Sequence, residues 1–230
     1  MSWLWPSDIP VPASEPPLMG LSVRLTEVGR LAKTDKGLAD IGTDHGRLPI
    51  AVVAAGWASR AVAIDRAADP LASARRRIEK TAWAERIHVR QGDGLHPLKP
   101  GEVDTVVIAG VGGRTAVSIL SAQALKKLGI RRLVLQPNRD DAELRRHLGA
   151  IGWPLMAETL VHDHGRLFYT AVAESGPVCT YSLVDQWLGP HLQTQSGALY
   201  RVFRQHRAKW LSQRKDVELA PVRRALADAL

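Results

Sequence analysis

The chain has 230 residues, of which 45% are hydrophobic and 23% are charged. This balance is typical of one large globular domain, or of one domain with a smaller appendage, and it excludes global disorder and a fibrous protein. No apolar run approaches the roughly 18 residues that cross a membrane. The single cysteine, Cys179, cannot form an internal disulfide, and no group of Cys and His has metal-site spacing. We therefore expect a cytoplasmic protein with no bound metal and no membrane partner.

The charge balance indicates what kind of partner the chain favours. Lys and Arg together number 31 against 23 for Asp and Glu, which gives a net charge of +8 at pH 7. Such an excess attracts polyanions over long distances and speeds encounters with them. It favours a nucleic-acid partner without proving one.

Residues 1–18 contain five prolines, a density that blocks both helices and central strands. We therefore expect an extended arm rather than folded structure. A secretory signal would need a basic start and an apolar stretch, and the segment has neither. Trp3 and Trp5 leave two interpretations open, a loosely held tail or an arm that docks on the body of the protein or on a neighbouring subunit.

Residues 19–176 alternate short apolar runs with amphipathic stretches, the pattern of a parallel sheet covered by helices on both faces. The expected strands are Gly37–Ile41, Ala61–Asp65, Ile87–Gln91, Thr105–Ala109 and Leu133–Gln136. Helices are expected between them, near residues 46–56, 69–83, 113–127 and 140–150. Two further strands, near 155–162 and 166–173, have no helix between them and predict a closing antiparallel hairpin. This α/β inventory is typical of Rossmann-like class I methyltransferases, whereas dinucleotide-binding folds usually end with another parallel strand.

Residues 177–230 are expected to form a small helical C-terminal region, with helices near 181–189 and 196–219, the second ending near Pro221. Six cations fall here within fifteen residues that contain no acid: Arg201, Arg204, Arg207, Lys209, Arg214 and Lys215. One interpretation is a solvated helix face. The other is a phosphate-contacting surface, because a like-charged run is mildly destabilising unless something anionic offsets it.

The loop after the first strand, Asp40 to Gly46, has the sequence D-I-G-T-D-H-G. A strand that ends in glycine and meets a helix start makes a tight turn with exposed backbone N–H groups. The side chains of Asp40, Asp44 and His45 flank Gly42, and the two carboxylates would repel a pyrophosphate. They suit a ligand that is cationic or zwitterionic at this place.

Two more acids lie at or just after the ends of the second and third strands. Asp65 ends the second strand about twenty residues after the loop, where a carboxylate accepts both hydrogen bonds of a ribose diol. Asp93 lies between Gly92 and Gly94 after the third strand, where it can accept from the exocyclic amine of adenine. A helix start and a plain turn would also explain these acids one at a time. Their occurrence at the ends of consecutive strands predicts an adenosine-containing ligand.

The fourth and fifth strands end at the mouth of the same cleft. Gly110, Gly112 and Gly113 leave the backbone bare after the fourth strand, which permits close approach of a ligand at the topological switch point. The fifth strand ends in L-Q-P-N, and the amide of Asn138 is a donor and acceptor suited to a base edge. Asn is also a favoured N-cap, and both roles are compatible with the sequence.

These motifs together resemble the bacterial tRNA (adenine-N1)-methyltransferases that act at tRNA position 22, the TrmK type. The resemblance covers about residues 21–173. It is carried by S-V-R-L from Ser22, D-I-G-T-D-H from Asp40 with Leu48-Pro49, D-P-L-A-S-A from Asp69, G-D-G-L from Gly92, A-G-V-G-G from Ala109, L-Q-P-N from Leu135 and G-R-L-F-Y from Gly165.

The resemblance implies S-adenosylmethionine as methyl donor, tRNA as substrate and a helical, coiled-coil-like C-terminal part. With tRNA as the partner, we expect the basic stretch around Arg201–Lys215 to contact it. In this interpretation Asn138 holds the base edge, and Asp44 and His45 orient the donor or accept a proton. Arg24, on a helix before the first strand, approaches the donor carboxylate or an RNA phosphate.

Other functions stay open at this point: a non-catalytic nucleic-acid-binding domain, or a methyltransferase for another RNA or a small molecule. The oligomeric state is left open too.

Overall fold

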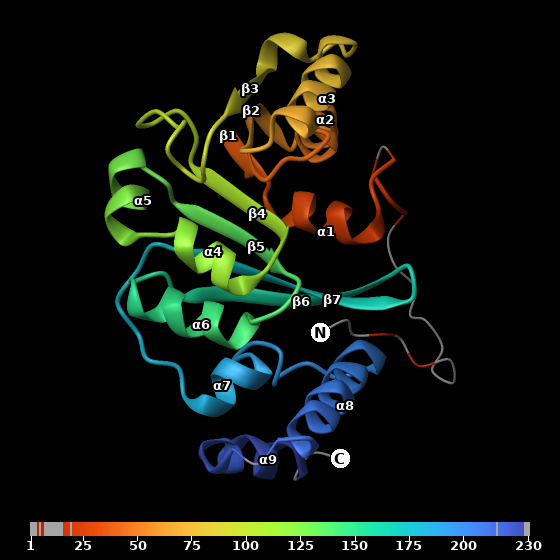
Figure 1. The fold of residues 1–230 in the computed structure, drawn as a ribbon, viewed down its shortest axis with the longest axis vertical. Coiled ribbons are helices and arrows are strands. Elements are labelled where there is room, and N and C mark those ends of the chain that lie inside the picture. Colours follow the sequence, from red (N-terminus) through yellow and green to blue (C-terminus); the bar gives the residue numbers. More distant parts are fainter. Residues whose placement is uncertain (1–3, 5, 7–15, 19, 215, 228–230) are drawn as a thin grey trace.

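The computed structural model describes residues 4, 6, 16–18, 20–214 and 216–227. Their strands form a seven-stranded sheet in the order β3-β2-β1-β4-β5-β7-β6 (Figure 1). The strands are β1 (Thr34–Ile41), β2 (Ala58–Asp65), β3 (Ile87–Gln91), β4 (Thr105–Val111), β5 (Arg132–Pro137), β6 (Leu155–Asp163) and β7 (Arg166–Glu174). The first five are mutually parallel, and β7 runs antiparallel to both β5 and β6. The predicted α/β fold with its closing hairpin is confirmed.

Helices cover both faces of the sheet because the side chains of its buried strands point alternately to the two sides. The helices are α1 (Val23–Leu31), α2 (Arg47–Ala54), α3 (Ala68–Glu79), α4 (Gly113–Ile119), α5 (Ala122–Leu128), α6 (Asp141–Ala150), α7 (Leu183–Leu188), α8 (Ala198–Ser212) and α9 (Ala220–Ala227). Apolar residues of α1, α2 and α3 pack with Leu38 and Val107 on one face. Those of α4, α5 and α6 pack with Ala39 and Val106 on the other.

The single helix expected over residues 113–127 is wrong. The structure has two helices, because Leu120 adopts extended backbone angles and Ser121 then caps α5. The Ser121 hydroxyl accepts a hydrogen bond from the backbone N–H of Ala124 at 3.2 Å. A serine at such a position favours a new helix start over a continued helix.

The helix expected over residues 196–219 is also wrong at its end. Helix α8 stops at Ser212, a short 3-10 turn follows at Val217–Leu219, and Pro221 lies in the first turn of α9. Proline fits the first turn of a helix, where its missing N–H has no intrahelical partner. Pro221 therefore marks a helix start rather than a helix end.

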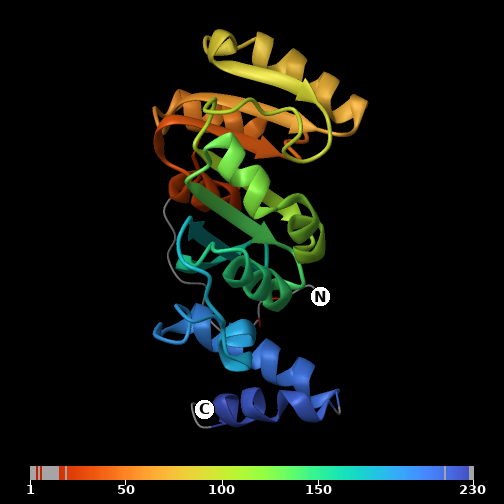
Figure 2. The ribbon, with the colours of Figure 1, turned by 90° about the vertical axis from the view of Figure 1, so that its left-hand side faces the viewer.

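The C-terminal helices lie at the β6 edge of the sheet, where Figures 1 and 2 show them in blue. A small core joins α7, α8 and α9 around Leu188, Leu211 and Val222. Beside it the rings of Trp187 and Trp210 lie 4.6 Å apart, centroid to centroid. Helix α8 also sends Phe203 into the core of the sheet domain. The core is thus continuous across the predicted domain boundary at 176/177. The boundary itself stays a prediction.

Most of the expected N-terminal arm, including Trp3 and Trp5, lies outside the described residues. Leu4 is described: it pairs with Arg166 of β7, and its carbonyl oxygen lies 2.6 Å from Nε2 of His206 on α8. Among the helices that the structure describes, none combines the length and apolar character needed to cross a membrane.

Candidate active site

A large cleft of about 1070 Å³ opens at the carboxyl edge of the sheet, where ligands of open α/β sheets bind. Its size suits a cofactor-sized molecule. Four of the predicted site residues line it: Gly42, Asp65, Asp93 and Gly94. Val111, from the end of β4, closes the opposite wall with residues of α4. We call this depression the large cleft.

The β1–α2 loop shapes one side of the large cleft. Gly42 has a φ of 76°, in the left-handed region that glycine tolerates, and a Cβ at this position would meet no atom within 4 Å. A larger residue would therefore project into open space beside the cleft. Below the loop, buried Asp40 accepts a hydrogen bond from the Thr43 hydroxyl at 2.7 Å. Burial raises the pKa of Asp40 to about 6, and the negative charges of Asp65 and Asp44 add to that rise.

Two carboxylates face the large cleft. Asp65 accepts backbone hydrogen bonds from Asp44 and Ala67, each at 3.0 Å. These bonds fix the carboxylate in place and leave acceptor capacity for a ligand. Asp93 is largely exposed, and its Oδ1 lies 4.0 Å from the Arg66 guanidinium.

Asp44 and His45 line none of the pockets described here. The His45 ring nitrogen Nδ1 lies 3.1 Å from the Ser73 hydroxyl on α3, and its Nε2 lies 3.5 Å from the Asp44 carboxylate. The structure therefore places both residues on the β1 side of the edge, in a group with Asp65. It does not bring them together with Asn138.

A second depression of about 540 Å³ lies at the ends of β4 and β5. Its lining comes from four places in the chain: Arg24, Gly110, Gly112, Asn138, Arg139, Arg166 and Phe168. We call it the arginine pocket. Gly110 and Gly112 belong to this pocket while Val111 between them lines the large cleft, so the end of β4 forms the ridge between the two depressions. Predicted Gly113 is buried and lines neither of them.

Asn138 lines the arginine pocket and forms hydrogen bonds to the backbone of the ridge. Its Nδ2 donates to the Gly110 carbonyl at 2.6 Å, and its backbone N–H donates to the Val111 carbonyl at 2.7 Å. Its Oδ1 lies 3.4 Å from Nε2 of Gln136. The alternative role of Asn138 as a helix cap is wrong, because α6 begins at Asp141 with Asp140 as its N-cap.

Three residues of this pocket were not among the predicted site residues: Arg139, Arg166 and Phe168. The guanidinium groups of Arg24 and Arg166 lie 5.2 and 5.5 Å from the Phe168 ring centroid, within cation–π range. Arg24 also donates to Oε1 of Gln136. The sequence held a signal for Arg166 and Phe168, because both lie in G-R-L-F-Y, at the start of the strand that follows the predicted hairpin turn. An antiparallel strand that starts there starts at the edge where the parallel strands end.

The basic C-terminal stretch is not one continuous surface. Arg207 and Arg204 are buried, with 5% and 9% of their surface exposed. Arg207 donates to Asp141, and Arg204 donates to the backbone carbonyls of Ala225 and Leu226. The interpretation of these two arginines as phosphate contacts is therefore wrong. Arg201, Lys209 and Arg214 are exposed, and Lys215 lies outside the described residues.

The residues of the large cleft fit the donor implied by the sequence. The open space beyond Gly42 and the carboxylates of Asp65 and Asp93 suit an adenosine moiety with a nearby positive charge. Within the described part of the chain, no group of three or more His, Cys, Asp or Glu is placed to hold a metal ion.

Comparisons with known proteins agree with this geometry. Residues 21–171 match the family model for a methyltransferase domain. The tRNA (adenine(22)-N(1))-methyltransferase of Bacillus subtilis (strain 168) is 39% identical over 156 residues, which are 68% of this chain and 66% of that enzyme. The chain thus aligns with just under two thirds of the length of this curated relative.

Solved structures extend the similarity over most of the chain. The Streptococcus pneumoniae protein Sp1610 has a TM-score of 0.82 at 30% identity, covering 90% of this chain and 98% of its own. The same protein has been solved with S-adenosyl-L-methionine, at a TM-score of 0.74 and 33% identity, covering 89% and 94%. The TrmK methyltransferase of B. subtilis has a TM-score of 0.73 at 32% identity, covering 91% and 95%. The resemblance stated from the motifs is confirmed: this chain belongs to the TrmK-type family of class I S-adenosylmethionine-dependent tRNA methyltransferases.

Proposed function

We propose that this protein transfers a methyl group from S-adenosylmethionine to ring nitrogen 1 of adenosine 22 in tRNA. One observation carries the proposal: two depressions with different charged linings meet at the ridge Gly110–Gly112, one with Asp65 and Asp93 beside Arg66 and His96, the other with three arginines and no acid. The large cleft presents carboxylates to a cationic donor. The arginine pocket presents cations and an amide to a nucleotide.

The donor is assigned to the large cleft, where it supplies a methyl group activated by a sulfonium. In this proposal Asp65 accepts from the ribose hydroxyls and Asp93 accepts from the adenine amine. Asp40 and Asp44 place negative charge near the donor's cationic part. Since Asp44 and His45 do not line the arginine pocket, we assign them to orienting the donor rather than to accepting a proton from the base.

The target adenine is assigned to the arginine pocket. Nδ2 of Asn138 is occupied by the Gly110 carbonyl. Oδ1 accepts one long hydrogen bond from Gln136, at 3.4 Å, and its second lone pair is assigned to the exocyclic amine beside ring nitrogen 1. Guanine carries a carbonyl there and a proton on ring nitrogen 1, so the same contact would reject it. Because methyl transfer requires accurate alignment, a fixed amide at this place contributes directly to the rate.

The arginines of the pocket are assigned to the RNA backbone. Arg24, Arg139 and Arg166 converge on one depression, and the charge-assisted bonds of guanidinium groups to phosphate are strong. Burial lowers the pKa of Arg24, an effect that nearby Asp163 partly offsets. A base that is normally paired must leave its stack to reach this pocket, and phosphate contacts on either side would hold the strand while it does so.

The remaining tRNA surface is assigned to the exposed cations of the C-terminal region, Arg201, Lys209 and Arg214. A tRNA substrate also places the enzyme in the cytoplasm.

The direct test is methyl incorporation from labelled donor into tRNA lacking the modification, with the position mapped by reverse transcription. A methyl on ring nitrogen 1 blocks base pairing and stops the transcript one nucleotide before it. The matched control is the same tRNA carrying guanosine at position 22, which is expected to accept no methyl there. Donor and tRNA binding without methyl incorporation would favour the non-catalytic alternative, and a stop elsewhere would contradict the assigned position.

A further inference from the structure

Four charged side chains are buried together where the C-terminal helices meet the sheet domain. Arg145 of α6 donates to Asp141 through Nη1 and to Glu158 through Nε, each at 2.7 Å. Arg207 of α8 donates to the same Asp141 carboxylate oxygen as Arg145. All four side chains are at most 6% exposed. The two positive charges balance the two negative ones, and α8 supplies one of the positive charges, Arg207.

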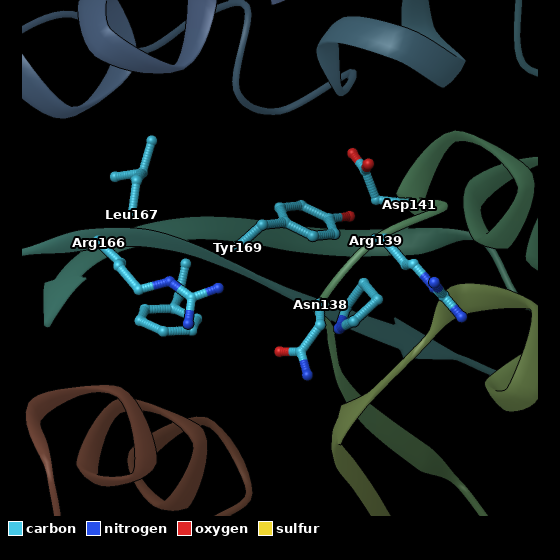
Figure 3. Close-up of a pocket in the computed structure, with 8 residues that line it drawn as sticks. Asn138, Arg139, Asp141, Arg166, Leu167 and Tyr169 are labelled. Carbon is cyan, nitrogen blue, oxygen red and sulfur yellow. The ribbon is translucent and has the colours of Figure 1, made fainter. Parts of the chain in front are cut away.

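This network touches the wall of the site. Asp141 lies three residues after Asn138, and both line the small cavity shown in Figure 3 together with Tyr169. The Tyr169 hydroxyl donates to Glu158 at 2.8 Å, and the Arg145 guanidinium lies 4.3 Å from the Tyr169 ring centroid. In Figure 3 the Asp141 carboxylate points toward the C-terminal helices while the Asn138 amide points away from them. The two side chains therefore project in opposite directions from the short segment that joins β5 to α6.

The loop between them includes a residue with left-handed backbone angles. Asp140 has a φ of 58°, in the left-handed region that costs a non-glycine residue energy, and its side chain makes no capping hydrogen bond to α6. On one side the Gly113 N–H donates to the Arg139 carbonyl at 2.8 Å. A Cβ on Gly113 would lie 2.3 Å from the Asp140 carbonyl oxygen, so the contact is too close for a side chain. On the other side the loop runs into Asp141, the first residue of α6, whose carboxylate accepts hydrogen bonds from Arg145 and Arg207.

We propose that Arg207 is a positioning residue for methyl transfer: by holding Asp141, it fixes the loop that presents the Asn138 amide to the base. The C-terminal helices then contribute to the chemical step and not only to contact with RNA. The inference rests on the proposed function for its activity readout, and on the loop geometry alone for its spectroscopic one.

The test compares Arg207→Met, Arg207→Lys and the matched control Arg224→Met, which removes one exposed cation from α9. Circular dichroism and a thermal transition establish the temperature at which each variant is folded. Three quantities are then measured on the full chain: donor affinity by calorimetry, tRNA affinity by filter binding, and the single-turnover rate at saturating donor and tRNA. The fourth readout is the side-chain amide NMR resonance of Asn138 in the free protein, identified by its absence in Asn138→Ser.

We expect Arg207→Met to slow single turnover roughly ten- to hundredfold, the size of effect that small misplacements have, with both affinities within about twofold of wild type. Its Asn138 amide resonance should shift or broaden. The single-turnover rate of Arg207→Lys should lie between those of Arg207→Met and wild type, because lysine keeps the charge but lacks the forked donor geometry of arginine. Arg224→Met should match wild type in all four readouts.

A wild-type rate in folded Arg207→Met would overturn the proposal, and so would a rate loss explained entirely by weaker tRNA binding. If Arg207→Met does not fold, Arg207→Lys decides: a wild-type rate with an unmoved Asn138 resonance overturns it. If the wild-type protein itself methylates no tRNA, the proposed function fails, while the NMR comparison still tests whether Arg207 orders the Asn138 amide.

Discussion

Oδ2 of Asp65 accepts a hydrogen bond from the backbone N–H of Asp44 at 3.0 Å, which joins the end of β2 to the loop after β1. The carboxylate that we assign to the donor ribose therefore also holds the loop that carries Gly42. A carboxylate has acceptor positions for both tasks, since its two oxygens offer about four lone pairs. If the assignment holds, donor binding and the order of this loop are coupled at Asp65.

Replacing Asp65 by Ala should weaken donor binding roughly ten- to hundredfold, since hydrogen bonds to a charged acceptor contribute about 1.5–3 kcal/mol. Asp65→Asn should retain part of the affinity, because one acceptor oxygen remains. Isothermal calorimetry on folded variants measures both. An unchanged dissociation constant in Asp65→Ala would remove this residue from the donor site.

Replacing Asn138 by Ser should leave donor affinity intact and slow methyl transfer by about two orders of magnitude, because the base loses its fixed partner. The lost bond to the Gly110 carbonyl should cost about 1 kcal/mol of stability. The start of α6 should be unaffected, since Asp140 occupies the cap position. Single-turnover rates on unmodified tRNA check the prediction, and a rate near wild type would leave Asn138 a purely structural clamp.

Replacing Arg201, Lys209 and Arg214 together by Gln should weaken tRNA binding at low salt and flatten its salt dependence. Each lost phosphate contact removes about 0.7–0.9 from the slope of log affinity against log salt. Donor affinity should not change. A salt series of tRNA binding measures the slope, and a slope equal to that of wild type would mean that these cations only face solvent.

Replacing Asp40 by Asn should stabilise the protein at neutral pH, by an amount that falls as the solution is acidified. The pKa of Asp40 is raised from 3.8 to about 6 by burial, so between these values the folded protein holds a proton that the unfolded chain does not. The wild type therefore gains stability from Asp40 as the pH falls through about 6 toward 4. A shift of this size corresponds to about 3 kcal/mol at pH 7.

Urea unfolding of wild type and Asp40→Asn at about pH 7, 6 and 5 measures that difference in free energy of unfolding. Using the difference cancels the titration of other groups, such as Glu102, whose pKa is lowered by its hydrogen bond with Arg90. A gap that stays constant across this range would contradict a raised pKa at Asp40.

The sequence predicts the sheet well because a polar or glycine residue ends or directly follows each of the five expected parallel strands. Asp65 and Asp93 follow from that pattern, since the ends of parallel strands meet at one edge. It predicts the C-terminal region less well. A run of cations does not say which of them points inward, and the carboxylate that pairs with Arg207 lies 66 residues away at Asp141. Such a pairing depends on the tertiary fold, which local patterns do not encode.

The contact between Trp187 and Trp210 gives the C-terminal helices an optical signature of their own. Two indole rings with centroids 4.6 Å apart and planes inclined by 34° couple their electronic transitions. That coupling produces a paired positive and negative band in circular dichroism, which a solitary tryptophan does not give. Among the tryptophans that the structure describes, Trp187 and Trp210 are the pair in ring contact, so this band would report on the packing of α7 against α8. Loosening of the C-terminal helices could therefore be followed by light alone, with no label and no substrate.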